Sequence, residues 1–262
     1  MKKRMLGLLL ALCMVLTLMP VSALADDIDT AEQASQTGAE GPSVQAQPKG
    51  IAIQAGETHT HCLCGENHKG DAYSDTNSVY HDNMTFETAW DKTTYLPSRE
   101  GTYYLTTDVT LSNTAAIYGH AVTICLNGHS ITYADGNALY PIGADLTITD
   151  CNKNPGYISA PKGIGIYAEW YPMGSSILPS RIYLYNISIK DCGRSAIDSN
   201  TSKDGSVFYL YNVSILNNKD GGIRTSRGST GQDVTIINSE ISDNGNYGVS
   251  ITDYSHLTMI NS

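Results

Sequence analysis

The feature that most constrains the fold is a repeat in the second half of the chain, built around an asparagine that recurs after 26, 26 and 23 residues. The asparagines are Asn186, Asn212, Asn238 and Asn261. Apolar residues keep fixed offsets from them: Ile182, Phe208, Val234 and Leu257 four residues before, Leu184, Leu210, Ile236 and Met259 two before, Ile189, Ile215 and Ile241 three after, and Ile197, Ile223 and Val249 eleven after. A fixed period of this length indicates structural units that stack on one another.

Each repeat contains short alternating segments rich in Ile, Val, Thr and Tyr, which favour strands over helices. One repeat is therefore expected to form one turn of chain, and successive turns to stack at about 4.8 Å, the spacing of hydrogen-bonded strands. The repeated asparagines are expected to point inward and to bond along the stack. We predict an all-β fold, a right-handed parallel β-helix of about five to six coils over residues 99–262.

Two earlier coils fit the same columns. Asp150 takes the asparagine position behind Leu146 and Ile148, and Gly128 takes that position one coil earlier. The apolar columns of the Gly128 coil are then Ile124, Leu126, Ile131 and Leu139. The interval of 36 residues between Asp150 and Asn186 exceeds one period, which predicts an insertion around residues 170–179.

These coils resemble a known superfamily. The segment 182–189, reading IYLYNISI and followed by Ser195-Ala196-Ile197, resembles coils of the pectin-lyase-like right-handed parallel β-helix superfamily. Residues 101–105 (GTYYL) and 125–129 (CLNGH) resemble the first coil of secreted bacterial surface proteins of that type. The resemblance covers about residues 100–262, and that superfamily includes lyases, hydrolases, epimerases and non-catalytic adhesins. It implies extracellular polysaccharide as the partner.

The first 57 residues are predicted to be a processing signal and a linker. Lys2, Lys3 and Arg4 precede an apolar run that ends at Ala23-Leu24-Ala25, which is typical of a signal peptide over residues 1–25. Residues 26–57 lack aromatic residues and are predicted to be a disordered acidic linker. Without the signal the formal charge changes from −10 to −13, which disfavours nucleic acid and anionic lipid as partners. We expect a secreted, extracellular or cell-surface protein with no transmembrane anchor in this chain.

Residues 58–98 form a segment that contains histidine and cysteine at metal-ligand spacing. The candidate ligands are His59, His61, Cys62, Cys64 and His68. Thiolate and imidazole suit tetrahedral zinc, and such a site would order a segment too short to have its own core. A redox pair or a plain polar linker is the alternative. Cys125, Cys151 and Cys192 are expected to be buried packing residues, or to form one disulfide and leave one cysteine unpaired.

Tyrosine is the abundant aromatic residue, with 17 copies against two Phe and two Trp. Tyr183, Tyr185, Tyr209 and Tyr211 fall in outward columns of two adjacent coils and are predicted to form a patch. Sugars stack on such rings, so the patch is a candidate glycan site. The alternative is that the 170–179 insertion or the N-terminal segment covers this face.

Asp198 and Arg224 are predicted to be neighbours on adjacent coils, and they are the two candidates for a catalytic role. In a lyase they would form half of the site, whereas the simpler reading is a cross-strand ion pair. Asp191, Asp220 and Asp243 lie in Asn- and Gly-rich bends, where they could bind calcium but are also ordinary turn residues.

The sequence therefore predicts a β-helix that binds extracellular glycans or acts as an adhesin. The alternative is a polysaccharide lyase or glycoside hydrolase whose catalytic residues lie partly outside this chain. Ser262 follows directly on Asn261, so the last coil is expected to be cut after its first strand. An open edge of this kind predicts a longer natural protein or end-to-end association with a partner.

Overall fold

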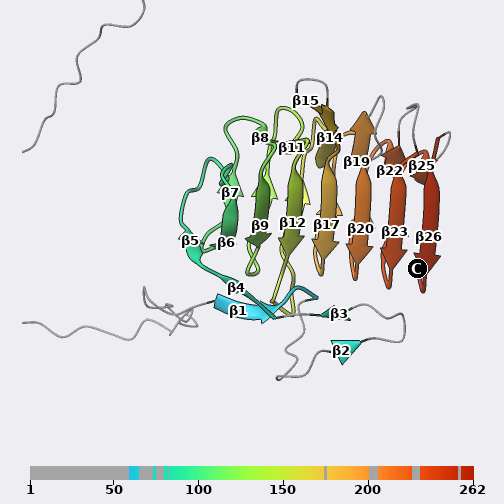
Figure 1. Cartoon of the computed structure of the whole chain (residues 1–262). Helices are drawn as coiled ribbons and strands as arrows, with labels where there is room; N and C mark the ends of the chain where they lie inside the picture. Colours follow the sequence, from blue (N-terminus) through green and yellow to red (C-terminus); the bar gives the residue numbers. More distant parts are fainter. Residues whose placement is uncertain are drawn as a thin grey trace, which may run out of the picture. The chain divides into compact units, whose positions relative to one another are not determined.

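The computed structural model describes residues 59–64, 73–74, 80–81, 83–173, 176–200, 206–225, 231–252 and 255–262. The predicted signal peptide, the predicted linker and His68 lie outside these residues. The described residues contain strands, turns and bends and no helix, and they form a parallel β-solenoid of about five turns (Figure 1). The predicted all-β, parallel solenoid is confirmed. None of the described residues belongs to a helix that is long and apolar enough to span a bilayer.

Three parallel sheets make up the solenoid. The first sheet contains β5 (Thr88–Trp90), β6 (Gly101–Leu105), β9 (Ala121–Cys125), β12 (Asp145–Thr149), β17 (Arg181–Tyr185), β20 (Val207–Tyr211), β23 (Asp233–Ile237) and β26 (His256–Ile260). The second contains β7 (Val109–Thr110), β10 (Ile131–Thr132), β13 (Tyr157–Ser159), β18 (Ser188–Lys190), β21 (Ser214–Leu216) and β24 (Glu240–Ser242). The third contains β8 (Ala115–Tyr118), β11 (Leu139–Ile142), β14 (Ile166–Glu169), β19 (Ser195–Asn200), β22 (Gly221–Thr225) and β25 (Tyr247–Ser250).

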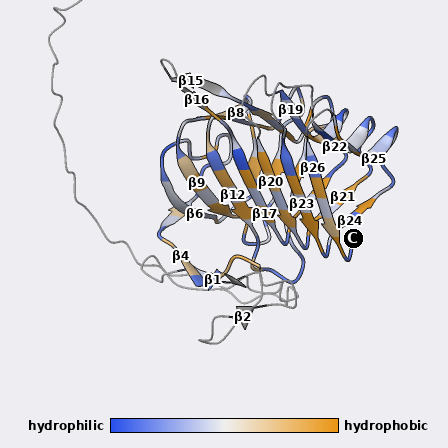
Figure 2. Cartoon of the chain, turned by 45° about the vertical axis from the view of Figure 1, so that its right-hand side comes forward, coloured by the Kyte–Doolittle hydropathy of each residue, from blue (hydrophilic) through white to orange (hydrophobic). Residues whose placement is uncertain are grey.

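The apolar columns predicted from the repeat are confirmed by the strand register. Ile182 pairs with Phe208, which pairs with Val234, and Ile197 pairs with Ile223 in the same way. These side chains belong to one continuous buried cluster, and hydrophobic colour recurs from strand to strand along the solenoid (Figure 2). Burial decreases at the last strand, where Leu257 is 41% and Met259 45% exposed.

The coil around residues 121–128 differs from the prediction by two residues. Cys125 pairs with Thr149, so Val122 and Ile124 occupy the columns of Leu146 and Ile148, and the predicted assignment of Ile124, Leu126 and Gly128 is wrong. The physical reason is the two-residue period of a strand, since a shift by two keeps the same side chains inside. The other two predicted columns are right, because Ile131 pairs with Ile158 and Leu139 with Ile166.

The repeated asparagines lie at bends between strands rather than inside the solenoid. Their φ angles are 49° at Asn186, 55° at Asn212, 50° at Asn238 and 52° at Asn261. This left-handed conformation is one that asparagine tolerates better than most residues, and here it leaves the side chains exposed or half-buried. The predicted inward orientation is therefore wrong, but the predicted bonding along the stack is present within two pairs of these asparagines. Asn212 Nδ2 donates to Asn186 Oδ1 at 2.8 Å, and Asn261 Nδ2 donates to Asn238 Oδ1 at 3.2 Å.

Two antiparallel hairpins project from the parallel sheets. β15 (Tyr171–Met173) pairs with β16 (Ser176–Leu178), which confirms the predicted insertion. β1 (His59–Cys62) pairs with β4 (Asn83–Phe86) and forms the N-terminal hairpin. A further short pair, β2 (Tyr73–Ser74) and β3 (Tyr80–His81), lies between β1 and β4 in the sequence.

Candidate functional site

The structure brings Asp198 and Arg224 together on β19 and β22, in the register that the repeat predicts. Arg224 Nε donates to Asp198 Oδ1 at 3.1 Å and Arg224 Nη2 donates to Asp198 Oδ2, so the contact is bidentate. The Asp198 side chain is 2% exposed and that of Arg224 is 39% exposed. The hydrogen bond that Arg224 donates to Asp198 raises the pKa of Arg224. Both carboxylate oxygens are engaged by the guanidinium, which is the geometry of a cross-strand ion pair.

A cleft of about 350 Å³ lies beside this pair on the third sheet. Its lining residues are Asn137, Ile164, Tyr167, Arg194, Asp198, Ser199, Asn200 and Arg224. Next to the cleft, the rings of Tyr140 and Tyr167 stack with centroids 5.4 Å apart and an interplanar angle of 27°. The Tyr140 hydroxyl donates to Glu169 Oε2, and Asn200 Nδ2 donates to Glu169 Oε1 at 3.1 Å. Burial, and then the Glu169 hydrogen bond, raise the pKa of Tyr140.

The four predicted tyrosines do meet on β17 and β20, but their face is partly covered. Tyr183 pairs with Tyr209 and Tyr185 with Tyr211, and the Tyr209 ring contacts the rings of Tyr183 and Tyr185. All four side chains are half-buried. Burial raises the pKa of Tyr185, with smaller contributions from the charges of Tyr209, Tyr183, Cys62 and Cys64. Because Cys62 and Cys64 are close enough to act on Tyr185, the structure favours the predicted alternative of a covered face.

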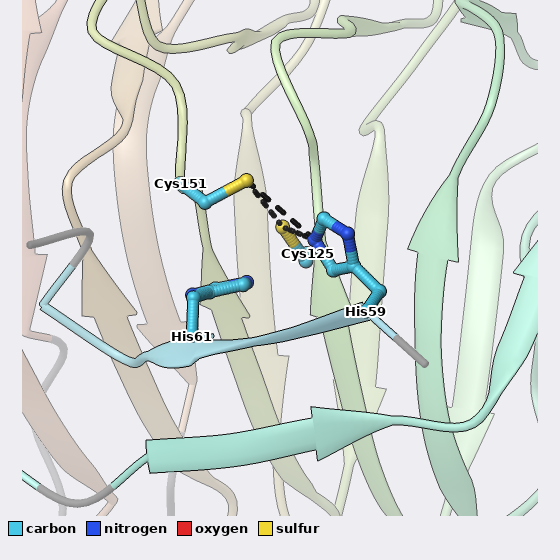
Figure 3. Close-up of side chains that lie close together, drawn as sticks. All are labelled: His59, His61, Cys125 and Cys151. Atoms are coloured by element: carbon cyan, nitrogen blue, oxygen red, sulfur yellow. Dashed lines mark hydrogen bonds between the residues drawn. The ribbon is translucent and has the colours of Figure 1, made fainter. Parts of the chain in front are cut away.

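A second group of side chains joins the N-terminal hairpin to the solenoid. His59 and His61 alternate on β1 and so share one side of the strand, Cys125 ends β9, and Cys151 follows β12 (Figure 3). His59 Nε2 lies 3.3 Å from Cys125 Sγ and 3.5 Å from Cys151 Sγ, and the two sulfur atoms are 3.8 Å apart. The four potential ligand atoms, one from each residue, all lie within 4.8 Å of one another.

Aromatic rings enclose this group. His59 stacks on Tyr104 with centroids 4.7 Å apart, and His61 stacks on Phe86 at 4.6 Å. Phe86, Tyr104 and Cys125 form a small buried cluster outside the main core. The Thr149 hydroxyl donates to the Leu63 carbonyl and adds a further contact between the hairpin and the first sheet.

The two thiols differ in their ionisation. The hydrogen bond from Cys125 lowers the pKa of Cys151, burial acts against this shift, and the contact with His59 lowers the pKa further. Burial and the neighbouring Cys151 sulfur raise the pKa of Cys125. Burial also lowers the pKa of His61 and favours its neutral form. The group thus combines a cysteine whose pKa is lowered with an imidazole whose neutral form is favoured.

The remaining predicted metal ligands lie elsewhere. Cys62 and Cys64 are buried with their sulfur atoms 2.8 Å apart, and His68 is outside the described residues. Sequence reasoning did not identify Cys125 and Cys151 as ligands, although their separation of 26 residues matches one coil and could have indicated that they are neighbours. Cys192 is buried, as expected for a packing residue. Among the described residues no second group of His, Cys, Asp or Glu has comparable spacing, so calcium binding stays a prediction.

No protein-family model, curated protein or solved structure matches the chain. The parallel β-solenoid is therefore established by its own strand pairing, whereas membership of the pectin-lyase-like superfamily stays a prediction.

Proposed function

We propose that the chain is a secreted or cell-surface β-solenoid that binds extracellular glycans on the outward face of its third sheet. The observation that carries this proposal is the Tyr140–Tyr167 stack beside the polar cleft. The signal-like residues 1–25 and the formal charge of −10 support an exported protein that does not bind nucleic acid. An adhesin would use the same face to hold a surface glycan on another cell.

The chemistry of this face suits a sugar ring. The C–H face of a pyranose packs on the ring of a tyrosine, and its hydroxyl groups need fixed donors and acceptors around it. Asn200 and Glu169 supply amide and carboxylate groups next to the Tyr167 ring, and Arg194 lines the same cleft. The tyrosines of the first sheet are less suited, because the Tyr209 hydroxyl is buried and Cys62 and Cys64 lie close to Tyr185.

Affinity electrophoresis in gels that contain neutral or uronate-rich polysaccharides tests the proposal. Removing one aromatic contact of about 1.4 kcal/mol weakens binding roughly tenfold, so Tyr167→Ala should lose most of the retardation of the wild type. Tyr157→Ala is the matched control, because Tyr157 lies on the second sheet with Lys190 over its ring at 4.2 Å.

The outcomes separate the two tyrosine faces. Retardation that survives Tyr167→Ala but disappears in the double variant Tyr183→Ala/Tyr209→Ala would move the site to the first sheet. Wild-type protein that no polysaccharide retards would refute the proposal.

A polysaccharide lyase or glycoside hydrolase is the second candidate, and the Asp198–Arg224 pair is the observation that favours it. A lyase would release unsaturated uronate, which absorbs in the ultraviolet, and calcium should be present in the assay. Asp198→Asn keeps a hydrogen-bond acceptor for Arg224 but removes the charge. Product formation that this variant abolishes would make the protein an enzyme, whereas product that persists would exclude this pair.

End-to-end association is a further part of the proposal. The apolar side chains of Leu257 and Met259 are exposed on β26, which ends the first sheet among the described strands. An edge of this kind can pair with a strand of a second copy. Light scattering should then show concentration-dependent dimers that Met259→Lys reduces, and a monomer at all concentrations would contradict this interpretation.

A further inference from the structure

We propose that His59, His61, Cys125 and Cys151 form a tetrahedral zinc site that fastens the N-terminal hairpin to the solenoid. This inference goes beyond glycan binding and does not depend on it. It also differs from the site that the sequence predicts, because two of the ligands come from the solenoid rather than from the CxC motif.

The three distances among His59 Nε2 and the two sulfur atoms match a tetrahedral site, and His61 lies within 4.8 Å of these atoms. With Zn–S bonds of about 2.3 Å and Zn–N bonds of about 2.05 Å, ideal angles place two sulfur ligands about 3.75 Å apart and a sulfur and a nitrogen about 3.55 Å apart. The observed separations are 3.8 Å between the two sulfur atoms, and 3.3 and 3.5 Å from His59 Nε2 to Cys125 and Cys151. These separations leave room for one ion between the atoms. A disulfide would need the sulfur atoms about 2.05 Å apart, well below the observed separation.

His61 supplies an independent observation. Its side chain is 9% exposed, and its Nε2 atom is buried with no hydrogen-bond partner among the described residues. Its Nδ1 atom lies 2.7 Å from the Cys62 carbonyl oxygen and, as a donor to that oxygen, leaves the lone pair on Nε2. Metal-binding histidines are commonly held in this way, with the second ring nitrogen donating to a backbone carbonyl. A zinc ion would give the buried Nε2 atom the partner that it lacks.

The donor set selects the class of metal. Two thiolates and two imidazoles form the four-coordinate set that zinc prefers, and they leave no open position for substrate or water. The stacked rings of Tyr104 and Phe86 cover His59 and His61, which also keeps solvent away. The site is therefore structural and has no catalytic position.

The role of the ion follows from the connectivity. β1 and β4 form a sheet of only two strands, and two-stranded sheets are marginally stable in water. His59 lies 66 residues before Cys125 and 92 residues before Cys151, so the ion would close long loops between the hairpin and two successive coils. Because the site exists only in the docked arrangement, metal binding would stabilise docking of the hairpin over the first sheet.

The test uses the full mature chain. Elemental analysis should find one zinc per chain, and Co²⁺ added to the zinc-free protein should give the intense visible bands of tetrahedral cobalt with thiolate charge transfer. Cys151→Ser and His59→Ala should each lose the metal and the cobalt spectrum. Cys192→Ser is the matched control, because it removes another buried thiol outside the group and should retain both. Cys62→Ser and Cys64→Ser should also retain the metal.

Limited proteolysis keeps the test decisive if a variant folds poorly. Chelation of the wild-type protein should expose the β1–β4 segment to cleavage while the far-ultraviolet circular dichroism of the solenoid persists, and zinc should reverse this exposure. Metal that is lost only in Cys62→Ser and Cys64→Ser would assign it to the CxC motif and overturn the proposal. Metal-free protein that is lighter by two hydrogens, with Cys125 and Cys151 in one cross-linked peptide, would overturn it as well.

Discussion

Asn218 is the residue whose replacement tests the interior of the solenoid most directly. It is 1% exposed and lies between the second and third sheets, where its side chain links three coils. Asn218 Oδ1 accepts a hydrogen bond from the Cys192 backbone N–H at 3.1 Å. Its Nδ2 atom donates to Asn244 Oδ1 at 2.8 Å and to the Ile189 carbonyl at 3.3 Å.

The expected cost of Asn218→Ala follows from the groups left without this side chain. The Cys192 N–H loses its acceptor, and Asn244 Oδ1 loses one of the two donors that Asn218 provides. A buried polar group left without a partner costs about 1–3 kcal/mol. With about 1 kcal/mol more for the hydrogen bond lost at Asn244 Oδ1, we expect the free energy of unfolding to fall by about 2–4 kcal/mol. Because an amide does not ionise, the loss should be the same at neutral and acidic pH.

Urea denaturation followed by circular dichroism measures this difference, with the slope m unchanged. The control is Asn212→Gly, because glycine keeps the φ of 55° while removing the exposed hydrogen bond to Asn186. It should cost about 1 kcal/mol or less. Equal losses in the two variants would refute the conclusion that the buried Asn218–Asn244 hydrogen bonds contribute more stability than the exposed Asn186–Asn212 hydrogen bond.

Two further predictions concern the core and the acid limit of stability. Ile223 is fully buried between Ile197 and Val249, so Ile223→Ala should lower the free energy of unfolding by about 2–5 kcal/mol in urea denaturation; a loss below 1 kcal/mol would contradict the stacked core. The backbone hydrogen bond from Ser130 lowers the pKa of Asp108. The ionised carboxylate therefore stabilises the folded state above the unfolded pKa of about 3.9. This stabilisation is lost as the pH falls through the lower pKa of the folded state. Asp108→Asn should reduce the slope of the unfolding free energy against pH in that acid range, by a small amount because the carboxylate is exposed. An unchanged slope would show that this hydrogen bond does not contribute to stability.

The sequence predicted the inward columns because each coil repeats the same burial. Ile197, Ile223 and Val249 must fill equivalent positions in successive coils, so their spacing survives in the sequence. The register of the earlier coil at Ile124 could not be fixed in this way, because a shift of two residues preserves the alternation.

The candidate sites were harder to predict because they depend on contacts between distant segments, which produce no repeating pattern in the sequence. The exposure of the face with Tyr183, Tyr185 and Tyr209 depends on a segment more than 100 residues earlier in the chain. No repeat in the sequence predicts where that segment packs. His59 and His61 were identified from local spacing, but Cys125 stands in a column that other coils fill with threonine or tyrosine, and Cys151 lies just after a strand, outside the repeated columns. The orientation of Asn186 and Asn212 was missed for a different reason, since a bend with positive φ reverses the direction that strand alternation predicts.

The decline in burial toward β26 has a consequence for how the molecule loses structure. A turn whose apolar side chains stay exposed gains less from burial, so opening it costs less free energy than opening a turn that is packed on both sides. Amide exchange should accordingly be graded along the axis, fastest in the turn that contains Leu257 and slow around Ile197. Local opening would therefore start in the turn that contains Leu257 while the interior turns stay folded.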